Sequence, residues 1–137
     1  MTRYLLDSNH LANGIRKVSA LRERIREMRR KGHKFATCWP ALFELEMGIA
    51  QTKDAEACHR NLRILLKEVR IRPLDWGLLG TFGQLHMQLK SRGRVLSFVD
   101  KVLAALAIIE DATILTADLD FQSLPEIRTE NWLPAPS

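Results

Sequence analysis

The chain has 137 residues, of which 46% are hydrophobic and 27% charged, and its formal net charge is +5. This length fits one domain with a buried core, so we expect residues 1–137 to form a single domain with a frayed tail over residues 131–137. No apolar run reaches the roughly 20 residues that span a bilayer, and the N-terminus lacks a secretory signal, which predicts a cytoplasmic protein with no membrane segment. The two cysteines form no C-x-x-C, which argues against a zinc cluster.

Short apolar runs of strand length alternate with helical patterns along the chain. In chain order we expect a strand over 3–7, a helix over 18–31, a strand over 33–39, helices over 40–50 and 54–67, a strand over 69–74, helices over 75–90 and 98–109, a strand over 112–118 and an edge strand over 127–133. This order predicts an α/β domain with a central, mostly parallel sheet of four to five strands, flanked by helices on both faces.

The local ends of these elements have ordinary signals. Gly32 ends the first long helix, Pro40 begins the next, and the stretch "SRGR" closes the helix that Asp75 can cap. Ser97 can cap the following helix, which is apolar almost throughout. These signals support the assignment of the helices. They do not explain why acidic residues stand at strand ends and in apolar helices.

Positive charge is concentrated in one segment. Residues 16–34 contain nine Lys or Arg and two Glu, so the rest of the chain is slightly acidic. One interpretation is a solvated helix face, and the other is a contact surface for a polyanion such as RNA or for an acidic protein partner. The candidate contact residues are Arg24, Arg26, Arg29, Arg30 and Lys31.

Two aspartates stand at the ends of apolar strands. Asp7 follows "YLL", and Asp118 ends "ATILTAD". In open α/β sheets, ligands bind beyond the carboxyl ends of the strands, which makes both residues candidates for a functional site. The alternatives are a helix cap for Asp7 and a turn aspartate for Asp118.

Two further acids lie in apolar helices. Asp100 precedes the run "VLAALAII", which has the composition of a buried helix, where an ionised carboxylate is costly unless it is paired or bound to metal. Glu44 shares a helix face with Ala41 and Gly48, whose small side chains leave room beside the carboxylate. The alternatives are a favourable charge in the first helical turn for Asp100 and a surface glutamate for Glu44.

Four such acids together favour one explanation. Carboxylates that meet in one pocket repel each other, and a divalent cation relieves that repulsion. Because no Cys or His cluster accompanies them, the oxygen ligands suit Mg²⁺ or Mn²⁺ rather than zinc. The four histidines are scattered, and only His10 is close to one of these acids in the sequence.

The chain resembles the PIN-domain family and, within it, the VapC-type toxins of bacterial toxin–antitoxin pairs. The resembling stretches are "YLLDSNHL", "PALFELEMGI", "GRVLSFVDKVLAALAI" and "ILTADLDF", in that order, followed by a final "NW". The match extends from about Arg3 to Trp132. Each motif alone is weak evidence for the family, whereas the ordered set with these spacings is fairly specific for it.

The resemblance implies a metal-dependent endoribonuclease whose acids surround Mg²⁺ or Mn²⁺. The matching catalytic and metal-binding positions are Asp7, Glu44, Asp100 and Asp118. Supporting positions are Ser8, Asn9, Thr116 and Asp120. Position 8 is Ser where Thr is commoner, and "TADLDF" is a short form of the last motif, so either Asp118 alone or Asp120 as well serves the site.

The same resemblance implies partners. VapC-type toxins form homodimers, act on RNA and are held inactive by a small antitoxin in the active-site groove. Two other classes of protein are alternatives. A phosphoryl-transfer hydrolase of the haloacid-dehalogenase type requires a second aspartate where this chain has Asn9. A non-catalytic PIN-fold module that binds RNA or protein would not require the acids.

Overall fold

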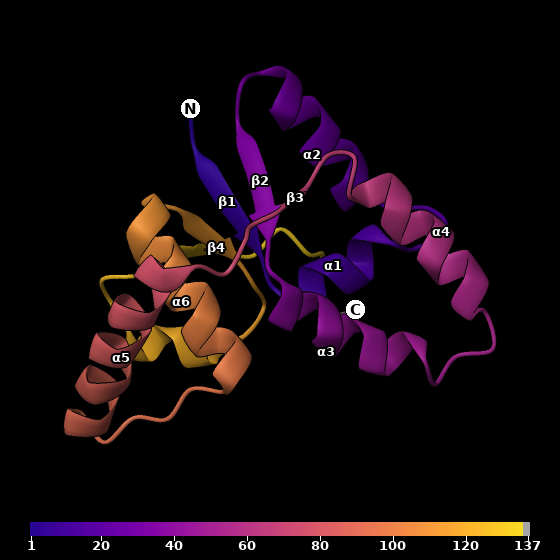
Figure 1. Cartoon of the computed structure of the whole chain (residues 1–137). Helices are drawn as coiled ribbons and strands as arrows, with labels where there is room; N and C mark the ends of the chain where they lie inside the picture. The colour runs from indigo at the N-terminus through magenta and orange to yellow at the C-terminus, as the bar shows by residue number, and fades with distance from the viewer. Residues whose placement is uncertain (136–137) are drawn as a thin grey trace.

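The computed structural model, which describes residues 1–135, contains one five-stranded sheet in the order β3-β2-β1-β4-β5 (Figure 1). The strands are β1 (Arg3–Leu6), β2 (Lys34–Thr37), β3 (Arg70–Ile71), β4 (Thr113–Leu115) and β5 (Thr129–Glu130). Neighbouring strands all pair in parallel. The predicted α/β fold class, with a parallel sheet flanked by helices, is confirmed.

Helices cover the sheet on both sides (Figure 1). They are α1 (Ser8–Gly14), α2 (Ala20–Arg30), α3 (Trp39–Ile49), α4 (Ala55–Leu65), α5 (Trp76–Ser91) and α6 (Phe98–Glu110), and a short 3₁₀ helix, η1 (Leu119–Ser123), follows β4. In Figure 1, α5 and α6 lie on one side of the sheet and α1 to α4 lie on the other. The strand order runs outward from β1 to β3 and then resumes at β4, on the opposite side of β1. The order therefore reverses between β1 and β4, which is where parallel sheets bind ligands.

The core is densest around the two central strands. Leu6 of β1 and both Ile114 and Leu115 of β4 are fully buried. Helix α6 packs against these strands, and its residues 102–107 are all buried. This burial explains why β1, β4 and α6 are the most continuously apolar stretches of the chain. None of the helices within residues 1–135 is long and apolar enough to cross a membrane.

Two short helical elements were absent from the expected element order, although a helix cap was one alternative for Asp7. Helix α1 has only seven residues, and η1 has five, so neither extends over enough turns to give a clear hydrophobic period. Both begin directly after a site aspartate, Asp7 and Asp118 respectively. The local structure around these acids is therefore more ordered than the sequence pattern indicated.

The predicted fraying of the chain from residue 131 is wrong for Trp132. Its ring packs at 4.9 Å from Tyr4 and 5.8 Å from Phe35, between ring centroids, and the Arg24 guanidinium lies 3.7 Å from its centroid. Its backbone N–H donates to Nε2 of His10 at 3.1 Å. The apolar ring is thus tied to the sheet, and residues 136–137 lie outside the described part of the chain.

Candidate metal centre

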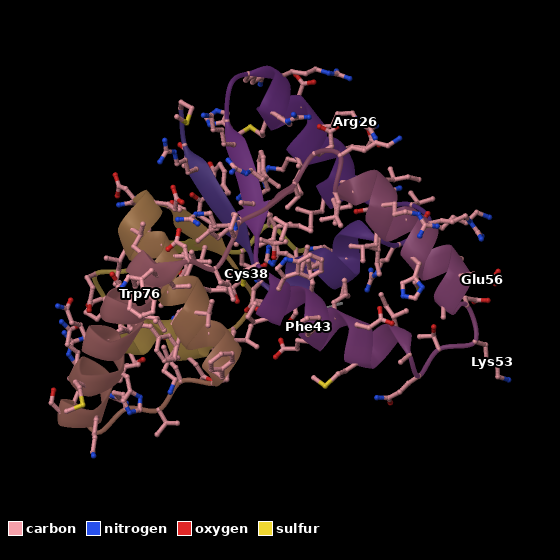
Figure 2. All side chains as sticks on the ribbon, in the orientation of Figure 1. Arg26, Cys38, Phe43, Lys53, Glu56 and Trp76 are labelled. Atoms are coloured by element: carbon pink, nitrogen blue, oxygen red, sulfur yellow. The ribbon has the colours of Figure 1, made fainter. Side chains whose placement is uncertain are left out.

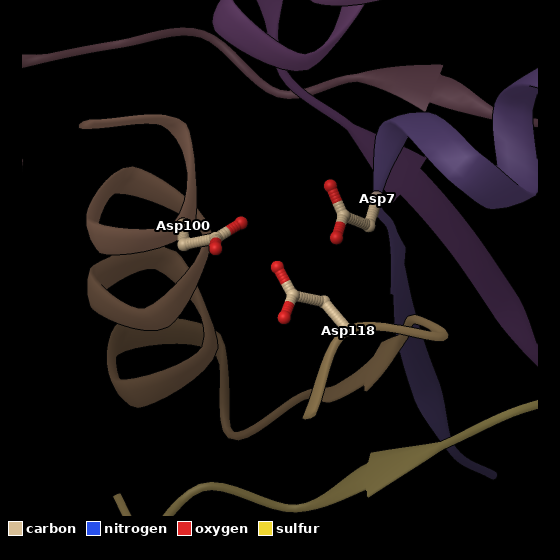
Figure 3. Close-up of side chains that lie close together, drawn as sticks. All are labelled: Asp7, Asp100 and Asp118. Atoms are coloured by element: carbon tan, nitrogen blue, oxygen red, sulfur yellow. The ribbon is translucent and has the colours of Figure 1, made fainter. Parts of the chain in front are cut away.

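Three carboxylates that are far apart in the sequence meet at the carboxyl edge of the sheet (Figure 3). Asp7, Asp100 and Asp118 each offer one oxygen, and these oxygens all lie within 4.8 Å of one another. Asp7 directly follows β1, Asp118 follows β4, and Asp100 lies in the first turn of α6. The cluster therefore occupies the position where the strand order reverses, as the sequence pattern predicted for Asp7 and Asp118.

Asp7 is held from two directions. Its Oδ1 accepts a hydrogen bond from the backbone N–H of Ser8 at 2.7 Å, which makes it the N-cap of α1. Its Oδ2 accepts from Oγ1 of Thr116 at 2.7 Å. The sequence posed capping and a functional role as alternatives, but the side chain caps α1 and also belongs to the cluster. With a side chain only 2% exposed, Asp7 is fixed before any ligand binds.

Asp100 is positioned by the start of α6. Ser97 caps this helix, and its Oγ accepts a hydrogen bond from the backbone N–H of Asp100 at 3.1 Å. Burial raises the pKa of the Asp100 carboxyl to about 7, assisted by the negative charge of Asp7 and by the adjacent Asp118. The Ser97 hydroxyl opposes this rise. Burial also raises the pKa of Asp7, against the hydrogen bonds from Thr116 and Ser8.

This electrostatic arrangement fits a divalent cation. The oxygens are close, two of the three side chains are buried, and the raised pKa values show that the cluster resists holding its full negative charge. A hard cation such as Mg²⁺ or Mn²⁺ prefers oxygen ligands of this kind. The donor set present in the protein therefore suits the ion that the sequence predicted.

Asp118 and Asp120 have different positions. Asp118 belongs to the three-carboxylate cluster, and its Oδ1 accepts a hydrogen bond from the backbone N–H of Asp120 at 2.8 Å, which caps η1. Asp120 is exposed and outside the cluster. Of the two acids that the sequence left open, the geometry therefore favours Asp118 as the metal-site acid and gives Asp120 a backbone contact.

Glu44 lies beside the cluster rather than in it. Its Oε1 accepts a hydrogen bond from the Ser8 hydroxyl. Its negative charge contributes to the raised pKa of Asp7, so the two carboxylates are neighbours. Because Glu44 is absent from the group of mutually close oxygens within residues 1–135, direct metal binding by this residue stays a prediction.

Thr116 and Asn9 connect the acids, as expected of supporting residues. The Thr116 hydroxyl donates to Asp7 and accepts from the backbone N–H of Asp118 at 2.9 Å, so one side chain links two acids. The Nδ2 group of Asn9 lies 3.5 Å from Oδ2 of Asp7, and its Oδ1 accepts from the backbone N–H of Ala117 at 3.2 Å. The ends of β1 and β4 are thus joined through polar side chains.

His10 extends this network to the end of the chain. It is fully buried, and burial lowers its pKa to about 4. Since Nε2 accepts from the backbone N–H of Trp132, the ring hydrogen is on Nδ1, which donates to Oδ1 of Asn9 at 2.7 Å. The sequence gave His10 no role in the site. Its proximity to Asp7 was the only signal, because its partner Trp132 is 122 residues away.

The basic residues of α2 are mostly paired with acids. Arg26 contacts Glu23 at 3.0 Å and Glu68 at 3.7 Å, and Arg29 contacts Glu68 at 2.8 Å. Arg30 similarly contacts Glu27 at 3.3 Å, whereas Lys31 is exposed.

The C-terminal end of α2 leads into the start of β2. The strands begin at the edge of the sheet that is opposite the acids. In Figure 2, Arg26 is far from Cys38, which follows β2 at the carboxyl edge. Contact with RNA or antitoxin through this segment stays a prediction. The C-terminal end of α2 lies away from the acids, whereas Arg16 lines the same pocket as Glu44.

Comparison with known proteins identifies the family. The PIN-domain family model matches residues 4–127, and the chain therefore belongs to the PIN-domain family. Among characterised relatives, the chain is similar to Ribonuclease VapC2 of Rickettsia felis, with 30% identity over 132 residues that cover 94% of this chain and 97% of the relative.

Solved structures show the same fold. The structure of VapBC2 from Rickettsia felis bound to a promoter DNA fragment contains a chain with a TM-score of 0.83 and 26% identity, covering 96% of this chain and 99% of the other. DNA-bound VapBC from Salmonella typhimurium gives a TM-score of 0.81 with 21% identity, covering 97% and 100% of the respective chains. The strand order and helix placement described above are thus those of the PIN fold.

Proposed function

We propose that this protein is a divalent-metal-dependent endoribonuclease and the toxin of a VapBC-type toxin–antitoxin pair, acting in the cytoplasm. The observation that carries the proposal is the convergence of Asp7, Asp100 and Asp118 at the sheet edge of a PIN-family chain. The similarity to a ribonuclease over nearly the whole length supports the choice of RNA as substrate.

In this proposal, Asp7, Asp100 and Asp118 hold Mg²⁺ or Mn²⁺, and Glu44 is the fourth acid, at the rim. When bound, the cation lowers the pKa of a water molecule and offsets negative charge on the phosphate under attack. Thr116 and Ser8 orient the Asp7 carboxylate, and Ser97 fixes the start of the helix that presents Asp100. A carboxylate of the site beside the attacking water accepts its proton.

We also propose protein partners, namely a small antitoxin and a second copy of the chain. Solved structures of similar fold are VapBC complexes, which supports the antitoxin. Helix α3, which begins at the carboxyl edge of the sheet, exposes an apolar stripe of Trp39, Phe43 and Met47, with Phe43 and Met47 each 63% exposed. Phe43 is labelled in Figure 2. Such a stripe gives a partner apolar surface to cover.

The proposal is tested by RNA cleavage with purified protein in Mg²⁺, in Mn²⁺ and in EDTA. We expect cleavage only with metal, and we expect Asp7→Asn to abolish both cleavage and growth inhibition in cells. Asp120→Asn is the matched control, because Asp120 is exposed outside the cluster, and it should retain activity. Cleavage that persists in EDTA, or in Asp7→Asn, would contradict the metal mechanism. A folded wild type that cleaves no RNA would favour the non-catalytic module.

A further inference from the structure

A second basic region, which the sequence did not single out, lies where α5 meets α6. A pocket of about 320 Å³ there is lined by four basic side chains above two buried leucines, namely His86, Lys90, Arg94, Lys101, Leu89 and Leu96. We call this the α5–α6 pocket. No acidic residue within residues 1–135 lines it.

The stretch "LKSRGRVL" forms one side of this pocket, because it contains the C-terminal end of α5 and the turn that follows it. Gly93 has φ of +64°, the left-handed conformation that favours glycine. The backbone N–H of Arg94 bonds to the carbonyl of Leu89 at 2.9 Å, and that of Gly93 bonds to the carbonyl of Lys90 at 3.1 Å. This pair of bonds is a Schellman motif, which turns the chain back over the last turn of α5. It brings Arg94 to the same pocket as Lys90, and the burial of Leu96 anchors the chain that follows.

Within residues 1–135, the cations of the α5–α6 pocket form no ion pair with an acidic residue. Among the ion pairs formed within residues 1–135, none involves Lys90, Arg94 or Lys101. The Nζ group of Lys101 instead lies 3.3 Å from Nδ1 of His86, a contact between two basic side chains. Unpaired cations around a concave surface create a positive potential that attracts an anion.

The pocket lies next to the acid centre along the chain. Lys101 follows Asp100 in the first turns of α6, and Leu96 precedes Ser97, whose hydroxyl receives the Asp100 backbone N–H. In Figure 1 the end of α5 and the loop into α6 lie at the same end of the molecule as the start of α6. In the proposal below, a nucleic-acid strand with one phosphate at the acids passes the start of α6 and places another phosphate at the pocket.

We propose that the α5–α6 pocket binds a backbone phosphate of the RNA substrate, flanking the scissile phosphate. This inference rests on the proposed ribonuclease function. Lys and Arg are the usual phosphate ligands, and apart from the His86 imidazole the residues that line the pocket include no aromatic ring on which a base could stack. The pocket therefore contributes affinity and positions the strand, and it does not read the RNA sequence.

The test compares the double variant Lys90→Ala/Arg94→Ala with a matched control, Arg60→Ala/Arg63→Ala, which removes two exposed charges from α4. Binding of a labelled RNA hairpin with single-stranded flanks is measured in EDTA over a series of salt concentrations, and cleavage is measured with Mg²⁺ or Mn²⁺. For the pocket variant we expect about tenfold weaker RNA binding, a salt dependence reduced by about 1 in slope, and a raised KM with kcat nearly unchanged. The control should change each quantity less than about twofold.

The conservative variant Lys90→Arg/Arg94→Lys keeps both charges and should retain the affinity, which separates loss of charge from loss of structure. Thermal unfolding of all variants checks that each one is folded. Equal RNA affinity and equal KM in wild type and pocket variant would overturn the inference, and so would equal weakening by the α4 control. These outcomes are distinct from failure of the proposed function, which is the absence of metal-dependent cleavage by the wild type.

Discussion

The basic segment on α2 and the acid centre are both highly charged, and they differ in how that charge is balanced. On α2, arginines such as Arg26 and Arg29 meet Glu23 and Glu68 in largely exposed pairs. At the sheet edge, Asp7 and Asp100 are buried beside each other with no cation among the described side chains. Exposed opposite charges stabilise a surface weakly, whereas buried like charges favour either protonation or a bound cation. The acid centre is therefore the region to which we assign a chemical role in the proposed function.

The variant Asp100→Asn tests most strongly whether the acid centre differs from α2 in how its charge is balanced. Removing one buried negative charge should lower metal-dependent cleavage by at least about a hundredfold, because a ligand of the cation is lost. The same change should stabilise the metal-free fold by about 1–2 kcal/mol, because repulsion with Asp7 and Asp118 is relieved. Cleavage kinetics and urea unfolding in EDTA measure the two effects. A variant that is both inactive and destabilised would contradict the account of like-charge repulsion.

Because His10 is buried, we expect it to make the stability of the protein depend on pH. The pKa of His10 is about 4 in the folded protein, below its ordinary value of 6.5. As the pH falls below 6.5, the unfolded chain binds a proton at His10 that the folded chain cannot, so the contribution of His10 to stability falls by about 3 kcal/mol down to about pH 4. Asp100, whose pKa is raised to about 7, contributes in the opposite direction over this range, so the effect of His10 is read from the difference between wild type and variant.

The measurement for His10 is the free energy of unfolding across this pH range, in wild type and in His10→Gln. The variant should be less stable at neutral pH, because the link between Asn9 and Trp132 is altered, and it should lack this part of the slope. Identical slopes in the two proteins would show that His10 titrates normally in the folded state.

Thr116→Val tests the support of the acids with almost no change in side-chain volume. The valine cannot donate to Asp7 or accept from the Asp118 backbone, so both carboxylates lose a fixed position. Loss of such a supporting contact typically lowers metal affinity by about tenfold to a hundredfold. Titration with Mn²⁺ measures this change, and Thr116→Ser, which keeps the hydroxyl, should recover most of the affinity. Wild-type affinity in Thr116→Val would remove Thr116 from the site.

We expect the smallest effect on stability and cleavage from removing the ion pairs of α2. Glu68→Gln removes the carboxylate that both Arg26 and Arg29 contact, and it should lower the free energy of unfolding by less than about 1 kcal/mol. Metal-dependent cleavage should be unchanged. A large loss of cleavage with an intact fold would mean that this surface takes part in the reaction, and the contrast drawn between the two regions would fail.

Much of the fold followed from the sequence, because long periodic or continuously apolar segments define strands such as β1 and helices such as α6. The site was predictable in part, since the rule that ligands bind beyond parallel strand ends applied to Asp7 and Asp118. Glu44 shows what the sequence cannot predict about the site. Its helix face could be predicted, but its distance from the other carboxylates depends on how α3 packs. His10 and the α5–α6 pocket depend on a partner 122 residues away and on the turn at Gly93, which local patterns do not reveal.

The central claim is that Asp7, Asp100 and Asp118 form one binding site for a divalent cation. The most direct measurement is isothermal titration of Mn²⁺ into metal-free wild type, Asp100→Asn and the matched control Asp120→Asn. The account predicts saturable binding by the wild type and by Asp120→Asn, and binding that is lost or strongly weakened in Asp100→Asn. Equal binding by the wild type and Asp100→Asn, or no binding by a folded wild type, would contradict it.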